Sequence, residues 1–326
     1  MRILVTGGAG YIGSTLTRQL LQEGYRVTVF DNLQFGGEAI IDLLRKRNFR
    51  LVHGDIRNKK QVQLVLRDID CIVHLAALVG EPACNVNPKA TDEINYQGTK
   101  ILCDFAKRSG VKRLIHISTC SNYGISDTNN PATEDAPLHP TSLYARTKIA
   151  SEEYVIKQAD KNFPVCILRL ATVYGISPRM RFDLLVNETT RDAFLTKKVV
   201  LYQPQAFRPF IHVSDVSKAI ITCIHASKNS ISGEIFNVAH NNYQKRDIVK
   251  LIQKYIPECK EKIMDKANDK RDYNVSFEKI KKKLGFKAKV DLRSGIKEIL
   301  TCLKLGIFKN PKDYRYTNVG WPNDEN

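Results

Sequence analysis

The chain has 326 residues, a formal net charge of +17, 43% hydrophobic residues and 26% charged residues. These values are typical of a globular protein and exclude a disordered or fibrous chain. No apolar run reaches the ~18–20 residues that a membrane-spanning helix needs, and the N-terminal residues lack the apolar centre of a signal peptide, so we expect a cytoplasmic protein.

The excess of positive charge has two interpretations. Lysines and arginines are spread along helical stretches such as residues 278–290 and do not alternate with aromatic residues in one stripe, which disfavours a nucleic-acid partner. A basic protein also attracts small polyanionic ligands by electrostatic steering. We therefore expect a small anionic ligand, with neither nucleic acid nor a membrane as partner.

The first half of the chain alternates short apolar runs with helical patterns. Strands are predicted at residues 2–6, 25–30, 49–54, 71–76, 111–118 and 164–171, and helices at about 12–23, 92–109 and 142–160. Strands that are apolar almost throughout, with helices between them, indicate a parallel sheet covered on both faces. The sequence therefore predicts a Rossmann-type, doubly wound α/β domain over residues 1–175.

After residue 175 the pattern is less regular. Helices are predicted at 177–194, 214–227, about 245–255 and about 292–303, and strands at 197–202 and 208–213. We predict a smaller, mixed α/β substrate-binding domain over residues 176–310, with some segments returning to the first domain. The polar residues 311–326 lack periodicity, and we expect a loosely held tail.

The cysteines give no sign of a metal or disulfide framework. The eight of them are scattered, without a CxxC pair or a His/Cys metal spacing, and Cys71 and Cys166 lie in apolar strand-like runs. We expect reduced, mostly buried thiols and no metal site.

A glycine-rich turn joins the first predicted strand to the first predicted helix. Gly7, Gly10 and Gly13 follow the pattern G-x-x-G-x-x-G. Glycines permit a tight turn and let backbone N–H groups approach a pyrophosphate at the positive end of a helix. The turn, including Tyr11 and Ile12, is therefore a predicted dinucleotide site.

Two aspartates follow the next strands. Asp31 lies 18 residues after Gly13, where a carboxylate can accept hydrogen bonds from ribose hydroxyls and repel a 2′-phosphate, which favours NAD over NADP. The alternative is a turn aspartate before Asn32. Asp55, followed by Ile56, can face the adenine in the same way, although a plain turn aspartate explains it almost as well.

Tyr144 and Lys148 lie four residues apart in a helical pattern, so their side chains share one face of the helix. A free phenol has a pKa of about 10 and is a poor base at neutral pH. A nearby ammonium, together with the positive nicotinamide ring of NAD⁺, favours the phenolate. Tyr144 could then remove a proton from a substrate hydroxyl while hydride leaves the same carbon. The alternative is a chance Tyr-x-x-x-Lys pair.

Hydroxyl side chains close the fifth predicted strand. Ser118, Thr119 and Ser121 stand in the stretch ISTCSNYG. A hydroxyl in that place can hydrogen-bond the reacting oxygen opposite the tyrosine. Serine and threonine also close many strands without any catalytic role.

These motifs form a recognisable set. TGGAGYIG, Asp31, HLAA, INYQGT, ISTCSNYG, YARTK and RPFIHVSDV, in this order from Met1 to about Leu303, resemble the extended short-chain dehydrogenase/reductase family, specifically its NAD-dependent nucleotide-sugar epimerases and dehydratases. By this resemblance, Thr119 is the catalytic Ser/Thr, Tyr144 the general base and Lys148 its partner on the nicotinamide ribose.

The resemblance also implies binding residues. The cofactor would be lined by Leu75, Ala76 and Ala77, with Asn95 in the family's helix asparagine position. Arg208 matches an arginine that clamps the nucleotide diphosphate, a task that suits the planar guanidinium. A second clamp at Arg271, and substrate contacts from Ser121 and Thr172, complete the set.

The resemblance leaves the reaction open. Family 4,6-dehydratases carry Thr-Asp-Glu where this chain has Thr119, Cys120 and Ser121, so neither acid for water elimination is present and an epimerase acting through oxidation at C4 is favoured. Residues 170–187 resemble a bacterial surface-polysaccharide subgroup that includes enzymes oxidising C4 of GDP-linked heptoses. A C4 dehydrogenase or ketoreductase is therefore the alternative, with a dehydratase or a non-enzymatic NAD-sensing protein behind it. Helices 92–109 and 142–160 suggest a homodimer.

Overall fold

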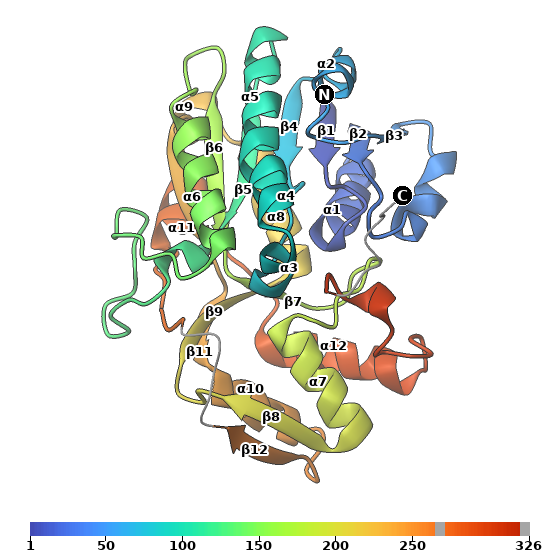
Figure 1. Cartoon of the computed structure of the whole chain (residues 1–326), viewed down its shortest axis with the longest axis vertical. Helices are drawn as coiled ribbons and strands as arrows, with labels where there is room; N and C mark the ends of the chain where they lie inside the picture. The colour runs from blue at the N-terminus through green and yellow to red at the C-terminus, as the bar shows by residue number, and fades with distance from the viewer. Residues whose placement is uncertain (265–270, 320–326) are drawn as a thin grey trace.

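The computed structural model describes residues 1–264 and 271–319, and its main feature is a seven-stranded parallel sheet with the strand order β10-β6-β5-β4-β1-β2-β3 (Figure 1). All of its neighbouring strands run parallel, and the doubly wound fold predicted from the sequence is confirmed. The strands are β1 (Arg2–Thr6), β2 (Arg26–Asp31), β3 (Phe49–His53), β4 (Cys71–His74), β5 (Leu114–Thr119), β6 (Val165–Leu170) and β10 (Glu234–Val238).

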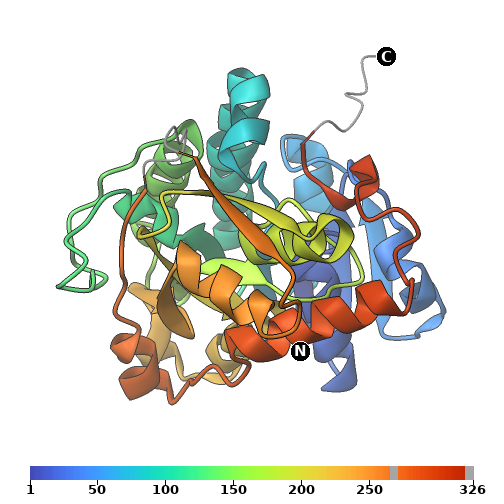
Figure 2. The same ribbon diagram turned by 90° about the horizontal axis from the view of Figure 1, so that it is seen from below.

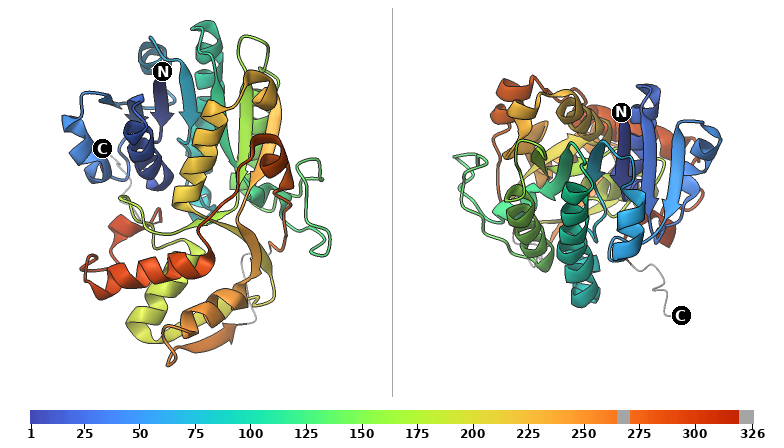
Figure 3. Two further views of the ribbon diagram at one scale, coloured as in Figure 1. Left: turned by 180° about the vertical axis from the view of Figure 1, so that it is seen from behind. Right: turned by 90° about the horizontal axis from the view of Figure 1, so that it is seen from above.

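Helices cover both faces of this sheet, as Figure 3 shows from above. Alternate residues of β1 divide between the two faces: Ile3 and Val5 belong to the same buried cluster as residues of α1 and α8, whereas Leu4 belongs to the cluster formed with α2, α5 and α6. The helices concerned are α1 (Tyr11–Gln22), α2 (Lys59–Val65), α5 (Thr99–Arg108), α6 (Leu143–Ile156) and α8 (Val213–His225).

A smaller part lies beyond the carboxyl ends of the strands. Its core is a third buried cluster, to which α7, α10 and α12 contribute (Figures 1 and 2). It contains the three-stranded sheet β11-β9-β7 and the two-stranded sheet β12-β8. Its elements are β7 (Thr172–Tyr174), α7 (Leu185–Thr196), β8 (Lys198–Tyr202), β9 (Phe207–His212), β11 (Asn241–Gln244), α10 (Lys245–Gln253), β12 (Lys260–Met264) and α12 (Leu292–Lys304).

The chain crosses between the two parts more than once. Residues 213–238 return from the smaller part, where α8 packs beside α1 and β10 pairs with β6 along the outer edge of the large sheet. The two parts therefore do not correspond to a single cut in the sequence. The remaining short elements are η1 (Glu38–Arg45), α3 (Glu81–Val86), α4 (Pro88–Asp92), η2 (Glu93–Gly98), η3 (Cys120–Tyr123), α9 (Lys228–Ile231), α11 (Glu278–Leu284) and η4 (Tyr314–Tyr316).

The predicted helix over 177–194 is wrong in its first eight residues. The helix α7 begins only at Leu185. The Asn187 side chain accepts from Gly175 N–H at 3.0 Å and donates to the Arg181 carbonyl at 2.8 Å. Because these bonds hold the preceding backbone outside a helix, residues 177–184 form an irregular segment before α7.

The predicted helix over 92–109 contains an irregular turn. Residues Glu93–Gly98 are π-helical and lead directly into α5. Within this turn the Asn95 side chain bonds the backbone of Leu78 on a different segment, accepting from its N–H at 2.8 Å and donating to its carbonyl at 2.9 Å. A π-helical turn of this kind is frequent beside functional sites.

The expectation of a loosely held tail is wrong for residues 316–319. The Tyr316 ring packs at 5.8 Å from Phe182 and 5.3 Å from Phe308, and its carbonyl accepts from Phe182 N–H at 2.7 Å. Asn318 N–H donates to the Asp183 carboxylate at 3.1 Å. Aromatic burial and backbone bonds therefore fix this end of the described chain, while residues 320–326 lie outside the described residues.

The cysteine thiols are free, and seven of the eight are buried, as predicted. Within residues 1–264 and 271–319, the longest apolar helices fall short of what crossing a membrane requires.

Candidate active site

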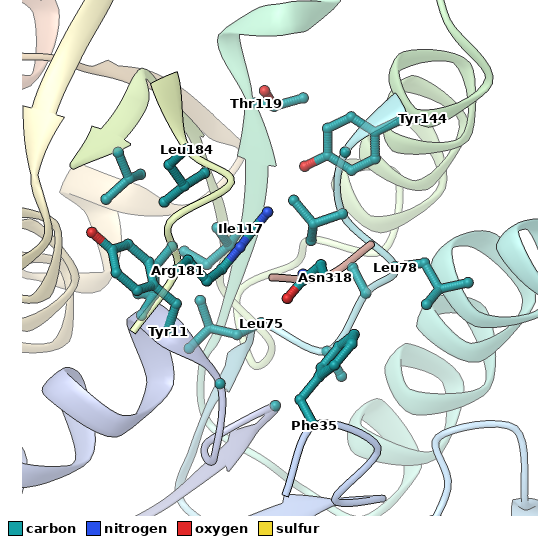
Figure 4. Close-up of a pocket in the computed structure, with 18 of the residues that line it drawn as sticks. Tyr11, Phe35, Leu75, Leu78, Ile117, Thr119, Tyr144, Arg181, Leu184 and Asn318 are labelled. Atoms are coloured by element: carbon teal, nitrogen blue, oxygen red, sulfur yellow. The ribbon is translucent and has the colours of Figure 1, made fainter. Parts of the chain in front are cut away.

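A cavity of about 890 Å³ opens at the carboxyl ends of β1, β2, β4 and β5, between the large sheet and the smaller part (Figure 4). Its volume lies near the upper end of the ~300–1,000 Å³ usual for ligand pockets. The strand order reverses between β1 and β4, and ligands of open α/β sheets bind at such a reversal. The cavity is therefore placed where this fold binds its ligand.

The glycine turn forms one wall of the cavity and has the close packing that a dinucleotide turn requires. A Cβ on Gly13 would lie 2.2 Å from the Gly7 carbonyl oxygen, and one on Gly7, whose φ is +72°, would lie 2.8 Å from Ala76 N. Gly10 precedes α1 as its N-cap residue. Glycines at these places bring backbone N–H groups and the start of a helix to the cavity, which fits a pyrophosphate.

Tyr11 takes a partly structural place in this turn. It lines the cavity, but its hydroxyl donates to the Gly175 carbonyl at 2.7 Å and accepts from the Asn187 side chain at 3.3 Å. Burial raises the pKa of Tyr11 well above its usual value. The phenol therefore ties α1 to the segment after β7, while Ile12 also lines the cavity.

Asp31 lies at the end of β2 with its carboxylate fixed by backbone donors. Ala9 N–H and Leu33 N–H each donate to it at 2.9 Å. Burial raises the pKa of Asp31, and these two hydrogen bonds oppose the shift. Asp31 and Asn32 both line the cavity, and the ribose contact stays a prediction.

Asp55 lines the cavity together with Ile56, but its carboxylate has a partner in the protein. Arg57 binds it at 2.6 Å. Burial raises the pKa of Asp55, but the hydrogen bonds and charge of Arg57 bring this pKa below its usual range. If this carboxylate contacts the adenine, it does so while also bound to Arg57.

The loop after β4 contributes Leu75, Ala76 and Ala77 to the cavity wall, as predicted. Asn95, predicted as a cofactor contact, is not among the residues that line the cavity. Its bonds to Leu78 hold this loop in place, and Leu78 itself lines the cavity. Asn95 is therefore a positioning residue for the loop.

The three predicted catalytic residues meet in the cavity. Thr119 ends β5, and Tyr144 and Lys148 belong to α6, which is capped by the Ser142 hydroxyl accepting from Ala145 N–H. Figure 4 shows Thr119 and Tyr144 on the same side of the cavity. The Lys148 ammonium lies 3.4 Å from Nε2 of His116, and Lys148 is only 3% exposed.

Burial and the neighbouring groups shift the pKa of Tyr144 in opposite directions. Burial, followed by the Cys84 thiol, raises the pKa of Tyr144, whereas Arg181, a hydrogen bond with Thr119 and then Arg271 lower it. Burial lowers the pKa of Lys148 to about 8, and Glu152 opposes that shift. Burial therefore dominates the pKa of Tyr144 in the protein alone, and the stabilisation of the phenolate by Lys148 together with NAD⁺ stays a prediction.

Basic side chains line the cavity on the side of the smaller part. Arg208, 2% exposed, stacks on Tyr273 with its guanidinium carbon 5.4 Å from the ring centre. Arg271 donates to the Ser121 hydroxyl at 2.9 Å. The predicted substrate residues Ser121, Thr172, Arg208 and Arg271 all line the cavity, with Lys245 in addition.

Several cavity residues carried no signal in the sequence. Except for Lys245, the first residue of α10, they lie in irregular segments, and their places depend on how distant parts of the chain pack. Arg181 binds Asp183 at 2.7 Å and points toward the centre of the cavity in Figure 4. The residues concerned include Phe35, Arg179, Arg181, Asp183, Lys245 and Asn318. Across the described ranges, no group of three or more His, Cys, Asp or Glu side chains could hold a metal ion.

Known proteins share this sequence pattern and fold. Residues 3–239 match the NAD dependent epimerase/dehydratase family. Over 278 residues the chain is 28% identical to the UDP-glucose 4-epimerase of Bacillus subtilis (strain 168), covering 78% of this chain and 82% of that protein.

Two solved structures superpose on nearly the whole chain. The UDP-glucuronic acid 4-epimerase of Bacillus cereus, solved with UDP-glucuronic acid and NAD, has a TM-score of 0.84 at 26% identity and covers 94% of this chain and 99% of its own. DesIV, a dTDP-glucose 4,6-dehydratase from Streptomyces venezuelae solved with NAD, has a TM-score of 0.84 at 27% identity and covers 95% and 99%. The chain thus belongs to the NAD-dependent epimerase/dehydratase family of extended short-chain dehydrogenases/reductases and is an enzyme that uses NAD.

Proposed function

We propose that this enzyme is a nucleotide-sugar epimerase that acts by transient oxidation at sugar C4. One observation carries the proposal: Thr119, Tyr144 and Lys148 line a single cavity with the glycine turn, and the two residues after Thr119 offer no carboxylic acid. This set supports removal and return of a hydroxyl proton and provides no acid beside Thr119 for the elimination of water.

The dinucleotide half of the cavity, the part lined by the glycine turn and Asp31, holds and orients the cofactor. The glycine turn offers backbone N–H groups to the diphosphate, and Asp31 offers its carboxylate to ribose hydroxyls. NAD, when bound, supplies the oxidant that takes up hydride from the substrate carbon. Lys148, buried beside Tyr144 on α6, would contact the nicotinamide ribose.

Tyr144 would remove and return the proton of the C4 hydroxyl. Because burial raises the pKa of Tyr144, the phenolate needs positive charge nearby, and Arg181 and Arg271 already lower that pKa. Thr119 would donate a hydrogen bond to the same sugar oxygen from the end of β5. Tyr144 would then hold the proton until it returns to the sugar.

The residues after Thr119 argue against ordinary 4,6-dehydration. Cys120 is fully buried and directs its thiol to the Arg169 carbonyl at 3.2 Å. Ser121 lines the cavity but accepts a hydrogen bond from Arg271. Neither residue is a carboxylic acid that could protonate a leaving hydroxyl, although dehydratases are among the similar structures.

The basic wall suits a nucleotide diphosphate. Arg208, Lys245 and Arg271 bring three cationic groups to the cavity wall. A guanidinium binds phosphate oxygens through its planar fork, and the net charge of +17 would attract such a polyanion. We propose that Arg208 and Arg271 bind the substrate diphosphate, with Ser121 and Thr172 toward the sugar.

The test is a screen of UDP-, dTDP- and GDP-linked sugars with the purified enzyme. Products are identified by NMR, and NADH is followed by its absorbance. The proposal predicts interconversion of C4 epimers without accumulation of NADH, because the hydride returns to the sugar. Stoichiometric NADH with a 4-keto product would instead establish a C4 dehydrogenase, and loss of water would establish a dehydratase.

The dehydrogenase is the second candidate because residues 170–187 resemble the surface-polysaccharide subgroup and place Thr172, Arg179 and Arg181 in the cavity wall. This resemblance also favours a role in polysaccharide biosynthesis in the cytoplasm. GDP-linked heptoses therefore belong in the screen.

A further inference from the structure

The C-terminal strap, defined as residues 316–319, forms part of the wall around the dinucleotide half of the cavity. After α12 the chain turns back toward the large sheet (Figure 1). Tyr316 anchors the strap by packing against Phe182 and Phe308. Beyond this anchor, Asn318 and Val319 line the cavity. The end of the described chain thus reaches a site whose glycine turn begins at Gly7.

The strap is held next to a buried arginine. Arg179 is 5% exposed, lines the cavity, and donates from Nη2 to the Thr317 carbonyl at 2.9 Å. Its Nε and Nη1 atoms have no hydrogen-bond partner. Unpaired donors on a buried cation are unfavourable. The strap therefore satisfies one nitrogen of this guanidinium and leaves two nitrogens for an acceptor from outside the protein.

Two neighbours show on which half of the cavity this arginine lies. The guanidinium carbon of Arg179 is 4.8 Å from the centre of the Phe35 ring, and Phe35 follows Asp31 on the loop after β2. The Oδ1 atom of Asn318 is also buried without a hydrogen-bond partner. Figure 4 shows Asn318 and Phe35 together on the cavity wall, on the opposite side from Thr119. These groups surround the space beside the predicted ribose site.

We propose that Arg179 binds a phosphoryl oxygen of the NAD diphosphate, that Asn318 accepts a hydrogen bond from the same dinucleotide, and that the strap thereby retains the cofactor. A phosphate offers the acceptors that a guanidinium with two unpaired nitrogens requires. Asn318 would accept from a donor such as a ribose hydroxyl. The inference rests on the dinucleotide site described above and does not require the proposed epimerase reaction.

The variant that tests Arg179 is Arg179→Met, because methionine keeps an unbranched apolar stem and removes the guanidinium. Binding of NADH, ADP, adenosine and UDP to the full-length chain is measured by fluorescence and calorimetry. Loss of a charge-assisted hydrogen bond weakens binding by ~10–100-fold. We expect this loss for NADH and ADP, and a change below about twofold for adenosine and UDP.

Matched variants distinguish a contact between the strap and NADH from a general effect of surface charge on NADH binding. Asn318→Ala and Tyr316→Ala should each weaken NADH binding by several-fold and speed its release. Arg315→Ala is the control, because this neighbouring guanidinium is exposed and pairs with Asp313 outside the cavity. It should leave NADH binding unchanged. Circular dichroism establishes that each variant is folded, and Arg179→Gln replaces Arg179→Met if the latter is not.

Several outcomes would overturn the inference. If the Arg179 variant binds NADH and ADP as tightly as the wild type, Arg179 does not bind the diphosphate. An equal loss for adenosine would show that the diphosphate is not what Arg179 contacts, and a loss confined to UDP would assign it to the substrate. Wild-type NADH binding and release in Asn318→Ala would remove the strap contact. If the wild type accumulates NADH during turnover, the proposed epimerase reaction is refuted. If Arg179→Met still weakens NADH binding in that case, the inference about Arg179 stands.

Discussion

Burial and charge act in opposite directions on the phenol of Tyr144. Burial raises its pKa, while Arg181, Thr119 and Arg271 favour the ionised form. The acidity of this hydroxyl therefore depends on the groups that share the cavity and not on α6 alone. The Tyr-x-x-x-Lys spacing made Tyr144 a candidate base, but its surroundings in the folded chain set its acidity.

Replacing Tyr144 with phenylalanine removes this hydroxyl and keeps the ring. Because a positioned general base contributes ~10²–10⁴-fold to the rate, we expect kcat to fall by that amount. The ring still fills its place, so the variant should bind NADH as the wild type does. Steady-state kinetics on the substrate found in the screen checks the rate, and Tyr255→Phe, outside the cavity, is the control. Wild-type turnover in Tyr144→Phe would remove the catalytic assignment.

Lys148 gives a prediction about pH and stability. Its folded-state pKa of about 8 lies below its ordinary value of 10.5 because it is buried. Between these values the unfolded chain binds more protons than the folded one, so the contribution of Lys148 to stability rises with pH across this window. Below pH 8 the folded state carries the full cost of the buried charge, about 3 kcal/mol.

Lys148→Met should therefore be more stable than the wild type at pH 7, with the difference shrinking as pH rises from about 8 toward 10.5. Urea unfolding of the cofactor-free chain at a series of pH values measures it. Lys157→Met, at an exposed place just after α6, is the control. A difference between Lys148→Met and the wild type that stays constant over the window would contradict the burial argument.

At the scale of elements, the join between β1 and α1 depends on how closely the backbone packs. An added Cβ at Gly13 meets the Gly7 carbonyl oxygen at 2.2 Å, whereas one at Gly10 has no neighbour nearer than 3.3 Å. Within the same G-x-x-G-x-x-G pattern, the fold thus requires a glycine at Gly13, whereas it has room for a side chain at Gly10. Their substitutions should have different consequences.

Gly13→Ala should lower the free energy of unfolding by about 1–3 kcal/mol and weaken NADH binding, because α1 must move away from the turn. Gly10→Ala should leave stability nearly unchanged and still weaken NADH binding, because the methyl group enters the cavity. Urea unfolding and NADH fluorescence measure the two effects. Equal stability of the two variants would show that the contact at Gly13 relaxes without cost.

Other elements departed from their sequence patterns for local reasons. The apolar spacing over 177–194 continues that of α7, yet bonds from Asn187 to Gly175 and Arg181 stop the helix at Leu185. Side-chain bonds of this kind compete with helical backbone bonds and leave no periodic signal. The strands of the large sheet were predictable because burial on both faces makes them apolar throughout.

At the scale of the whole molecule, the cavity is assembled from segments as far apart as Gly7 and Val319. The glycine turn, the loop after β4 and the end of β5 come from the large sheet, and Arg208 comes from β9 in the smaller part. Closing of one part against the other would therefore change the cavity without changing the sheet itself.

We predict that the enzyme is a homodimer in which α5 and α6 of two copies meet. These helices lie side by side on one face of the sheet (Figure 1), where the Lys100 ammonium lies 5.2 Å from the centre of the Tyr154 ring. Light scattering at micromolar concentration should give twice the chain mass. Lys100→Glu with Tyr154→Lys should shift the protein toward monomer, and Lys228→Glu on α9 should not. A monomeric wild type would refute the prediction.

The sequence by itself determined the doubly wound sheet and the glycine turn and made Thr119, Tyr144 and Lys148 the candidate catalytic residues, because each depends on local periodicity or on a short motif. Only the tertiary structure decided that Arg179 and Asn318 join Phe35 at the dinucleotide half, since three distant segments must pack before those side chains meet. The raised pKa of Tyr144 has the same origin. Burial is a property of the packed chain, and no spacing of residues encodes how far water is excluded.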